Sequence, residues 1–535
     1  MSTRKFYITT AIPYANAEPH VGHVLELIGA DTIARAKRLL GYEVYFQTGT
    51  DEHGQKMLEA ASKAGLSAQE YADKIAPRFR NLWRDLDVAY DGFVRTTDPA
   101  HRAGVVQFWK KVRDNGDIYL GKYEGWYCVP DESFVLESQV QLGSNGEKLC
   151  PQCGRQLTWH SEENYVFRWS KYQQALEQWI AEHPDFIAPA FRANEMINSF
   201  LRPGLQDISI SRTTIAWGIP VPDDPAHVIY VWFDALLNYI TGIGYGTDEE
   251  RFRHWWPCDL HVVGKDILKF HTLLWPAMLM AAGVEPPRRV FGHGFVVLRG
   301  AEKMSKSKGN VVDPRELLEL FHGNPDPLRY YLLSENDFGH DAVFSLDGLI
   351  GKYHADLADK LGNLLARTLS MVTKYRDGRV VRPATFEAAD LAIRAKVLAL
   401  WQPAHDQSSR LLYEQLVDEG LFAQLLQRCF AAISEMNAYV TEQRPWALAK
   451  DPAQAQRLDQ VLYVLVEGLR LVAAQLFPII PRSAAAIWRQ LGLAQPPDKT
   501  SFTELSTWGA LSETTIKPEG ILFPKLESPP QPPNS

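Results

Sequence analysis

Residues 5–49 read KFYITTAIPYANAEPHVGHVLELIGADTIARAKRLLGYEVYFQTG, and this stretch decides the fold. The β-branched and aromatic run at 5–12 predicts a buried strand, 21–41 has the period of an amphipathic helix ending at Gly41, and 43–49 predicts a second strand. Strand, helix and strand in this order predict a βαβ unit of a parallel sheet with a right-handed crossover. Because such sheets bind ligands at the carboxyl ends of their strands, residues 11–23 are expected to border a site.

Two histidines, His20 and His23, flank Gly22 at the predicted start of this helix. The i, i+3 spacing places both rings on one helix face. They stand beside the free N–H groups and positive dipole end that suit a phosphate chain, and Gly22 leaves room for a planar base. A helix-capping pair with a packing glycine explains the same residues, so both interpretations stay open here.

Composition describes an ordinary globular protein, with 46% hydrophobic and 22% charged residues among 535. The length favours two to four domains. Five irregularly spaced cysteines make no disulfide framework and favour a reducing compartment. The N-terminus lacks a signal pattern and no apolar run reaches ~18 residues, so we expect a soluble, cytoplasmic protein with no membrane partner. A net charge of −8 excludes unspecific coating of nucleic acid and requires any RNA to meet local basic patches.

The pattern of elements changes twice along the chain. From about Gly116 to Asp224, turns, tryptophans and a cysteine pair replace the α/β alternation, which predicts an inserted domain. Alternation resumes in HVIYVWFDALLNYI, DLHVVGKDILKFHTLLWPAMLMAAG and RRVFGHGFVVL, which we interpret as pieces of the same sheet. Beyond about Gly351, long amphipathic periods predict a bundle of helices.

A second motif, GAEKMSKSKGN at 300–310, sets lysines among serines and glycines. A solvated charged turn is the commoner fate of such a loop. Together with the histidine pair, however, it predicts a helix terminus that holds ATP and a mobile cationic loop that closes over the leaving phosphates.

On these two motifs the chain resembles class I aminoacyl-tRNA synthetases. Their HIGH signature corresponds to His20-Val21-Gly22-His23, and their KMSKS signature to 303–307. The resemblance implies a Rossmann-type parallel α/β sheet split by a connective insertion and followed by a C-terminal α-helical bundle that binds the anticodon. The expected divisions are 1–115 and 227–298 for the two catalytic halves, 116–226 for the insertion, 299–350 for the KMSKS loop and stem-contact region, 351–523 for the anticodon-binding domain and 524–535 for a disordered Pro-rich tail.

In the chemistry that this family performs, an amino-acid carboxylate attacks the α-phosphorus of ATP, so no general base is required. Catalysis then rests on positioning and on charge neutralisation by imidazoles, lysines and Mg²⁺. The catalytic residues implied are His20, His23, Lys303 and Lys306. Those implied to contact ATP or the adenylate are Gly22, Gly264, Lys265, Asp266, His293 and Ser305.

Five segments, AIPYANAEPHVGH, TGTDEHG, YVWFDAL, VVGKDILKFH and KMSKSKGN, are similar to the methionyl-tRNA synthetases in particular. By this resemblance Asp51 holds the α-amino group of methionine, and Phe270 and Trp275 move to close on the side chain. Aromatic walls suit a thioether, because sulfur packs well against ring edges. Leu236 stands where some relatives carry proline. The expected methionine pocket comprises Ala11, Ile12, Tyr14, Asp51, Trp232, Leu236, Tyr239, Ile267, Phe270, His271 and Trp275; each set alone also fits plain core packing.

The insertion raises a metal question. Cys150-Pro-Gln-Cys153 has metal-ligand spacing, whereas Cys128-Val-Pro-Asp131 has an aspartate where relatives place a second cysteine. Three thiolates and a carboxylate can hold structural Zn²⁺ tetrahedrally, and the alternative is a lost site in a tight turn. At roughly 110 residues the insertion is too short for the hydrolytic editing domain of the isoleucine, valine or leucine enzymes.

For RNA, residues 351–379 carry six Lys or Arg against three Asp. By resemblance, Asn363, Arg367 and Trp446 contact the CAU anticodon of initiator and elongator tRNA(Met) through stacking and edge hydrogen bonds. We expect a monomer. The rivals are another class I synthetase such as the cysteinyl enzyme, a non-catalytic RNA-binding paralogue with eroded signatures, and a nucleotidyltransferase, for which a helical domain of this size would be surplus.

Overall fold

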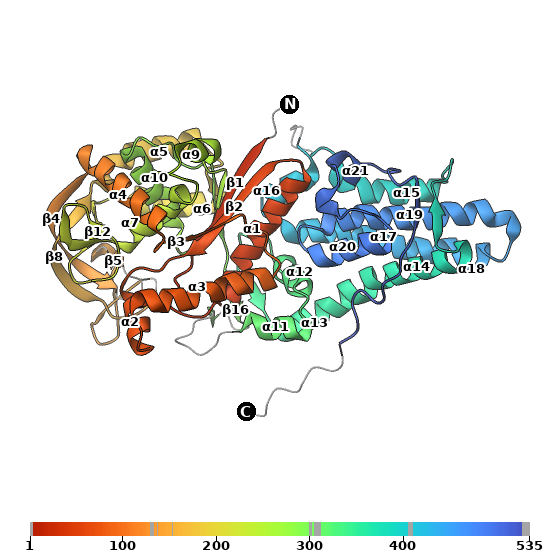
Figure 1. Cartoon of the computed structure of the whole chain (residues 1–535), viewed down its shortest axis with the longest axis horizontal. Helices are drawn as coiled ribbons and strands as arrows, with labels where there is room; N and C mark the ends of the chain where they lie inside the picture. Colours follow the sequence, from red (N-terminus) through yellow and green to blue (C-terminus); the bar gives the residue numbers. More distant parts are fainter. Residues whose placement is uncertain are drawn as a thin grey trace, which may run out of the picture.

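The computed structural model describes residues 4–526 except 129–132, 136, 152, 299–301, 304–311 and 405–409. Figure 1 shows the insertion at one end of the molecule, the parallel sheet in the middle and the long C-terminal helices at the other end. Helix α1 (Val21–Leu39) lies between the sheet and these helices.

One six-stranded sheet forms the centre, in the order β3-β2-β1-β14-β15-β9, and every neighbouring pair is parallel. Its strands are β1 (Lys5–Thr10), β2 (Glu43–Thr50), β3 (Gly92–Arg95), β9 (Ile187–Ala188), β14 (Leu260–Gly264) and β15 (Val290–His293). The predicted split parallel sheet is therefore confirmed. Chain order reverses between β1 and β14, and a crevice opens beyond the carboxyl ends of strands at such a switch point.

Helices cover this sheet and lead into the site. They include α2 (Gln55–Lys63), α3 (Ala68–Asp85), α4 (Pro99–Asp114), α7 (Val231–Ala235), α8 (Asn238–Thr241), α9 (Glu249–Trp255) and α10 (Trp275–Ala281). Helix α1 ends two residues earlier than its pattern predicts, at Leu39, and Gly41 follows with φ +84°. A glycine in this left-handed conformation is a common helix terminator because it has no Cβ to clash.

The insertion contains antiparallel sheets, as its turn-rich sequence predicts. They are built from β4 (Ile118–Cys128), β5 (Ser133–Val135), β6 (Gln141–Leu142), β7 (Lys148–Leu149), β8 (Thr158–Phe167), β10 (Ile208–Ser209), β11 (Ser211–Arg212), β12 (Pro220–Val221) and β13 (Asp224–Ile229), with α5 (Gln173–Glu182) and α6 (Ala190–Met196) beside them.

Two strands differ from the sequence interpretation. β13, part of HVIYVWFDALLNYI, pairs with β11 and β12 in a small antiparallel sheet, so assigning it to the parallel sheet was wrong. In contrast β9, from within the insertion range, pairs in parallel with β15 and forms the edge of the central sheet. Pairing partners this distant in sequence leave no local signal.

After β15 a three-stranded sheet of β16 (Val296–Leu298), β17 (Glu302–Lys303) and β18 (Ala342–Phe344) leads to α11 (Pro314–Leu320), α12 (Asp326–Ser334) and α13 (Leu346–Lys352). The C-terminal helices are α14 (Asn363–Arg376), α15 (Ala388–Leu398), α16 (Leu412–Asp418), α17 (Phe422–Gln443), α18 (Pro445–Leu448), α19 (Ala455–Leu476), α20 (Pro481–Gln490) and α21 (Phe502–Ser506). One short antiparallel pair, β19 (Arg379–Val381) with β20 (Glu513–Thr515), interrupts the helices.

The C-terminal helices pack around α19, which is buried on all its faces from Gln460 to Leu476. Its buried charges are paired, since Arg470 donates to Glu467 at 2.8 Å, so this helix can serve as the core of the C-terminal helices. Across the part of the chain that is described, none of the helices combines the length and apolar character that crossing a bilayer requires. Of the predicted tail, 527–535 lies outside the described residues, and the carbonyl of Pro524 accepts a hydrogen bond of 2.6 Å from Tyr353.

Candidate active site

A pocket of about 340 Å³ lies at the switch point between β1 and β14. Its walls come from the carboxyl ends of the strands and from the start of α1. The residues that line it are Thr10, Ala11, Ile12, Pro13, Tyr14, His20, Gly22, His23, Glu26, Leu27, Thr48, Asp51, Trp83, Trp232, Ala235, Leu236, Asn238, Tyr239, Gly264, Asp266, Ile267, His271, His293, Phe295 and Val296.

The two histidines both cap α1 and line the pocket. His20 Nδ1 accepts a hydrogen bond from Gly22 N–H at 3.1 Å, and His23 Nδ1 accepts from His20 N–H at 3.2 Å. The two rings are in contact, with centroids 3.9 Å apart and planes tilted by 31°. Because each Nδ1 accepts from the backbone, each neutral ring must carry its proton on Nε2. The cap therefore fixes both imidazoles as Nε2–H donors at a helix N-terminus, where anions are favoured.

Gly22 has a steric role that the sequence did not reveal. A Cβ at this position would lie 2.9 Å from both Cε1 and Nδ1 of His20. The glycine therefore leaves room for the His20 ring itself.

The end of the pocket beside Trp232, Tyr239 and His271 is lined by aromatic rings. Trp232 stacks on Phe270 with centroids 3.9 Å apart and planes 13° apart. His271 Nδ1 donates to the carbonyl of Ile267 at 3.0 Å, and its Nε2 accepts from the Tyr239 hydroxyl at 2.7 Å. Burial lowers the pKa of His271 to about 4, so the ring is uncharged at neutral pH.

Most of the predicted residues come together in this pocket, but three described ones do not line it. Phe270 stands behind Trp232, and the fully buried Trp275 donates its indole N–H to His261 Nε2 at 3.3 Å. Lys265 points to Asp341, with Nζ–O distances of 2.7 and 2.8 Å. The family resemblance placed these residues at the pocket, but in this structure their side chains face other partners.

The pocket also contains a carboxyl that the sequence analysis missed. Glu26 Oε2 lies 2.8 Å from His293 Nε2, and His293 Nδ1 donates to the carbonyl of Gly294 at 2.7 Å. Burial raises the pKa of Glu26, against the lowering effect of His293. The signal was present, since Glu26 follows His23 by three residues on the same helix face.

The KMSKS segment starts beside the pocket. The backbone of Lys303 in β17 pairs with Val297 of β16, next to the lining residue Val296. The side chain of Lys303, and Ser305 and Lys306 altogether, lie outside the described residues. The described part of this segment and the histidine pair thus belong to one side of the molecule.

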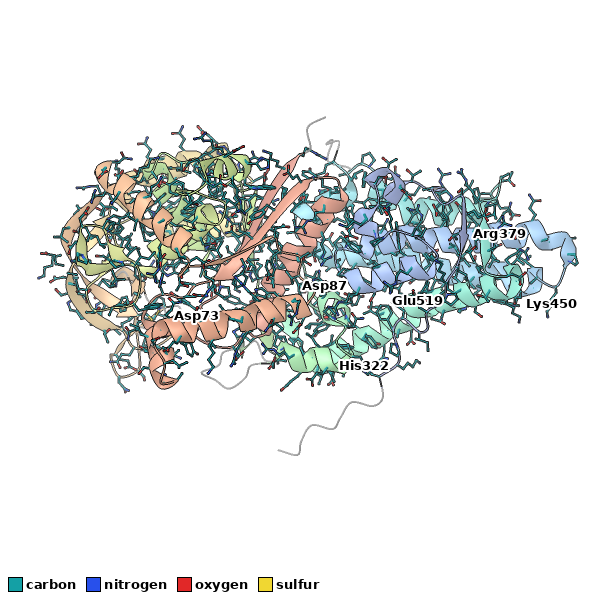
Figure 2. All side chains as sticks on the ribbon, in the orientation of Figure 1. Asp73, Asp87, His322, Arg379, Lys450 and Glu519 are labelled. Carbon is teal, nitrogen blue, oxygen red and sulfur yellow. The ribbon has the colours of Figure 1, made fainter. Side chains whose placement is uncertain are left out.

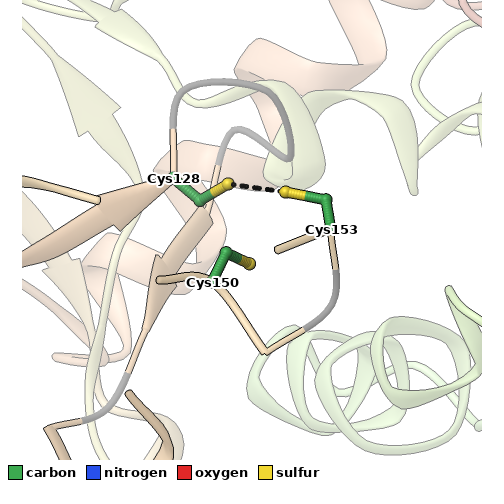
Figure 3. A group of neighbouring side chains, drawn as sticks. All are labelled: Cys128, Cys150 and Cys153. Atoms are coloured by element: carbon green, nitrogen blue, oxygen red, sulfur yellow. Dashed lines mark hydrogen bonds between the residues drawn. The ribbon is translucent and has the colours of Figure 1, made fainter. Parts of the chain in front are cut away.

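Three cysteine sulfurs of the insertion converge (Figure 3). Those of Cys128, Cys150 and Cys153 all lie within 4.8 Å of one another, with 3.4 Å between the first and the last. Tetrahedral Zn²⁺ with Zn–S bonds of ~2.3 Å places its sulfurs ~3.8 Å apart, so this donor set fits the ion. Asp131, the predicted fourth ligand, lies outside the described residues.

Asn363 and Arg367 lie four residues apart on α14, where Asn363 is exposed, and Trp446 on α18 is 41% exposed. Trp446 is therefore not a core residue.

The basic stretch 351–379 is less available than its composition indicates. Lys352 contacts Glu335, Lys360 contacts Asp356, Arg376 contacts Asp459 and Arg379 contacts Glu513. Arg379 lies toward the far end of the helices in Figure 2. Because these four charges are paired within the protein, the stretch gives weaker support for an RNA surface than its count of lysines and arginines.

A split parallel sheet, a histidine-capped helix at its switch point and a short strand that leads into the KMSKS sequence are the features of a class I aminoacyl-tRNA synthetase. Residues 6–369 match the family model described as "tRNA synthetases class I (M)". The chain belongs to this methionyl family of class I tRNA synthetases.

Similar sequences and a similar solved structure support this family assignment. The chain is 46% identical over 526 residues to a methionine–tRNA ligase of Caldanaerobacter subterraneus subsp. tengcongensis, covering 98% of this chain and 79% of that one. It is 44% identical to a methionine–tRNA ligase of Thermotoga maritima, covering 98% and 81%. The structure superposes with a TM-score of 0.91 on Mycobacterium tuberculosis methionyl-tRNA synthetase in complex with methionyl-adenylate, at 43% identity and with 98% and 100% of the two chains covered.

Proposed function

We propose that this chain joins L-methionine to tRNA(Met) in two steps, forming methionyl-adenylate from ATP with release of pyrophosphate and then transferring the methionyl group to the 3′-terminal ribose. The observation that carries the proposal is the division of one pocket into two chemistries. One end presents two imidazole Nε2–H groups at a helix N-terminus, and the other presents neutral aromatic walls.

Each step of the reaction can be attributed to particular residues of the pocket. The ionised carboxylate of methionine attacks the α-phosphorus, so the protein supplies position and charge neutralisation rather than a base. His20 and His23 donate to the phosphate oxygens through their fixed Nε2–H groups. Lys303 and Lys306 neutralise the departing pyrophosphate, while Mg²⁺ accompanies ATP.

The other half of the pocket selects the amino acid. Asp51, buried at the end of β2, receives the α-amino group, and Trp232, Leu236, Tyr239 and His271 surround the thioether. Gly22, Gly264, Asp266 and His293 border the adenylate. No cysteine is among the described residues that line the pocket, which disfavours thiolate–zinc recognition of a cysteine substrate.

The test is methionine-dependent exchange of radiolabelled pyrophosphate into ATP across a panel of amino acids. Methionine should drive exchange, and Lys306→Ala should lower it by about two to three orders of magnitude because it removes charge from the leaving phosphates. Lys63→Ala, on the outer helix α2, is the matched control and should keep the wild-type rate. Exchange driven by another amino acid, or full activity of Lys306→Ala, would refute the proposal.

We assign structural Zn²⁺ to Cys128, Cys150 and Cys153, with Asp131 as the fourth ligand. Bound there, the ion would fasten the turns of the insertion, and four protein ligands leave no open position for a reacting water. Metal analysis of purified protein should return about one zinc per chain, and Asp131→Ala should lower its retention against a chelator. Protein that is folded and metal-free would contradict the assignment.

Reading of the anticodon by Asn363, Arg367 and Trp446 is supported by the exposure of Asn363 on α14 and of Trp446 on α18. Trp446→Ala should raise KM for tRNA(Met) by about tenfold, the loss of one stacked base, and leave pyrophosphate exchange unchanged. Charging assays with initiator and with elongator tRNA measure the KM for each tRNA, and the exchange assay measures activation of methionine. Action in the cytoplasm as a monomer, on both tRNAs, stays a prediction.

A further inference from the structure

Asp234 is a fully buried carboxylate that does not line the pocket. It contacts two histidines, His53 and His101. Its Oδ2 lies 2.6 Å from His53 Nδ1, and its Oδ1 lies 2.8 Å from His101 Nε2. Asp234 is 0% exposed and each histidine 1%. Burial opposes ionisation of Asp234, but the two imidazoles outweigh it and lower its pKa to about 2.

The partners of the histidines fix where the protons lie. An ionised carboxylate only accepts, so His53 Nδ1 and His101 Nε2 must both carry hydrogens. His53 Nε2 then faces Arg102 Nη2 at 3.4 Å as an acceptor, and His101 Nδ1 meets the Thr241 hydroxyl at 2.7 Å. A satisfied buried network of this kind holds its members in one arrangement.

This network joins the two walls of the amino-acid end of the pocket. His53 follows Asp51 by two residues at the end of β2, and Asp234 follows Trp232 by two residues on α7. Asp51 and Trp232 both line the pocket, whereas Asp234 does not. The wall that receives the α-amino group is therefore tied to the wall that receives the side chain through a single carboxylate.

We propose that Asp234 is a positioning residue for methionine: it acts through His53 and His101 to hold Asp51 and Trp232 at the separation that the substrate requires. The proposal rests on the function proposed above. It assigns Asp234 no contact with ATP, because the walls it joins belong to the methionine end.

The experiment measures KM for methionine and for ATP separately in pyrophosphate exchange. Asp234→Ala should raise KM for methionine by about tenfold and leave KM for ATP within about twofold, because only one end of the pocket loosens. Asp234→Asn should restore most of the affinity. Its amide oxygen still accepts from His53, and its N–H₂ can donate to His101 Nε2 once the ring proton moves to Nδ1, with the Thr241 hydroxyl turning to the carbonyl of Asn238 at 3.5 Å.

Asp259→Ala is the matched control. Asp259 is also a carboxylate of the catalytic fold, accepting from Tyr7 N–H at 2.7 Å and from Arg288 at 2.6 Å, but it precedes β14 and does not line the pocket. Asp259→Ala can lower thermal stability, yet both KM values should stay at the wild-type level. An unchanged ratio of the two KM values in Asp234→Ala would overturn the proposal.

If Asp234→Ala does not fold, a double-mutant cycle of Asp234→Asn and Thr241→Val tests the positioning role of Asp234 instead. Valine removes the acceptor that the displaced proton of His101 needs, so the double variant should raise KM for methionine by more than the product of the two single effects. Simple multiplication would overturn the proposal. Wild-type protein is assayed first: absence of methionine-dependent exchange refutes the proposed function, whereas active wild type with these negative results refutes only the role of Asp234.

Discussion

The position of the His20 ring depends on the absence of a side chain at Gly22. Gly22→Ala places a Cβ 2.9 Å from the ring, which must shift and release its cap. We expect pyrophosphate exchange to fall by about 10²-fold, since a displacement near 1 Å at a catalytic group costs this much. Gly351→Ala, on exposed α13 with no atom within 4 Å of the added Cβ, should leave the rate unchanged. Equal rates for the two variants would contradict this role of Gly22.

The buried His271 predicts a pH dependence. Its pKa falls from 6.5 to about 4 on folding, so between these values the unfolded chain binds a proton that the folded chain does not. Stability should therefore decline as pH falls from 6.5 towards 4, by at most about 3 kcal/mol from this group. Urea denaturation at pH 7 and pH 5 measures the decline. His271→Gln should show a smaller decline than wild type, and the same decline in both would count against the assignment.

At the level of single residues, the sequence predicted which residues lie near the pocket better than it predicted where their side chains point. His20, His23, Asp51 and Trp232 could be placed because motif spacing and strand ends determine which backbone borders the site. The partner of Lys265 could not be predicted, because Asp341 lies 76 residues further along the chain. Whether His20 caps a helix or faces the pocket was a false choice, since it does both.

Helix α1 connects the active site to the C-terminal helices. Its Asp31 accepts from the fully buried Arg329 at 2.7 Å, and Arg329 also donates to the carbonyls of Pro478 and Ile479 at 2.9 and 2.8 Å. Near its end, Lys37 contacts Glu414 and Asp418 of α16 at 2.9 and 2.8 Å. The helix that carries the histidine pair is thus held by charged contacts along the side away from the sheet.

Arg329→Met should lower the free energy of unfolding by about 3–5 kcal/mol, because it removes the donor from three buried carbonyls and leaves the buried carboxylate of Asp31 with Arg35 as its remaining ion-pair partner. Arg482→Met is the control, since Arg482 is 44% exposed and contacts the carbonyl of Gly323 in solvent. It should change stability by less than about 1 kcal/mol. Denaturant titration of both variants measures the difference, and similar losses would show that Arg329 has no special structural weight.

Long periodic elements could be predicted at this scale, and short paired ones could not. α17 follows its amphipathic period, whereas α19 was predicted as a helix but is buried on every face from Gln460 to Leu476, because other C-terminal helices surround it. β9, with two residues, exists only because β15 offers it an edge. β13 carries the apolar residues of a sheet strand, but its neighbours β11 and β12 decide which sheet it joins.

For the whole molecule, the order of sheet, insertion, sheet and helices could be predicted from changes in periodicity along the chain. The relative arrangement could not, because it depends on buried contacts such as Arg329 with Pro478 that join residues far apart in sequence. The convergence of Cys128 with Cys150 and Cys153, in contrast, was predicted from the sequence as part of one ligand set, and the three sulfurs do lie together.

The two residues of β9 have a consequence for anyone who would trim this protein. Deleting the insertion would remove β9 and make β15 an exposed edge strand. Its unpaired backbone N–H and C=O groups could then pair with another chain, which leads to aggregation. The insertion therefore also covers the edge of the central sheet through β9. A chain without the insertion should precipitate or self-associate, which light scattering would detect before a loss of activity could be measured.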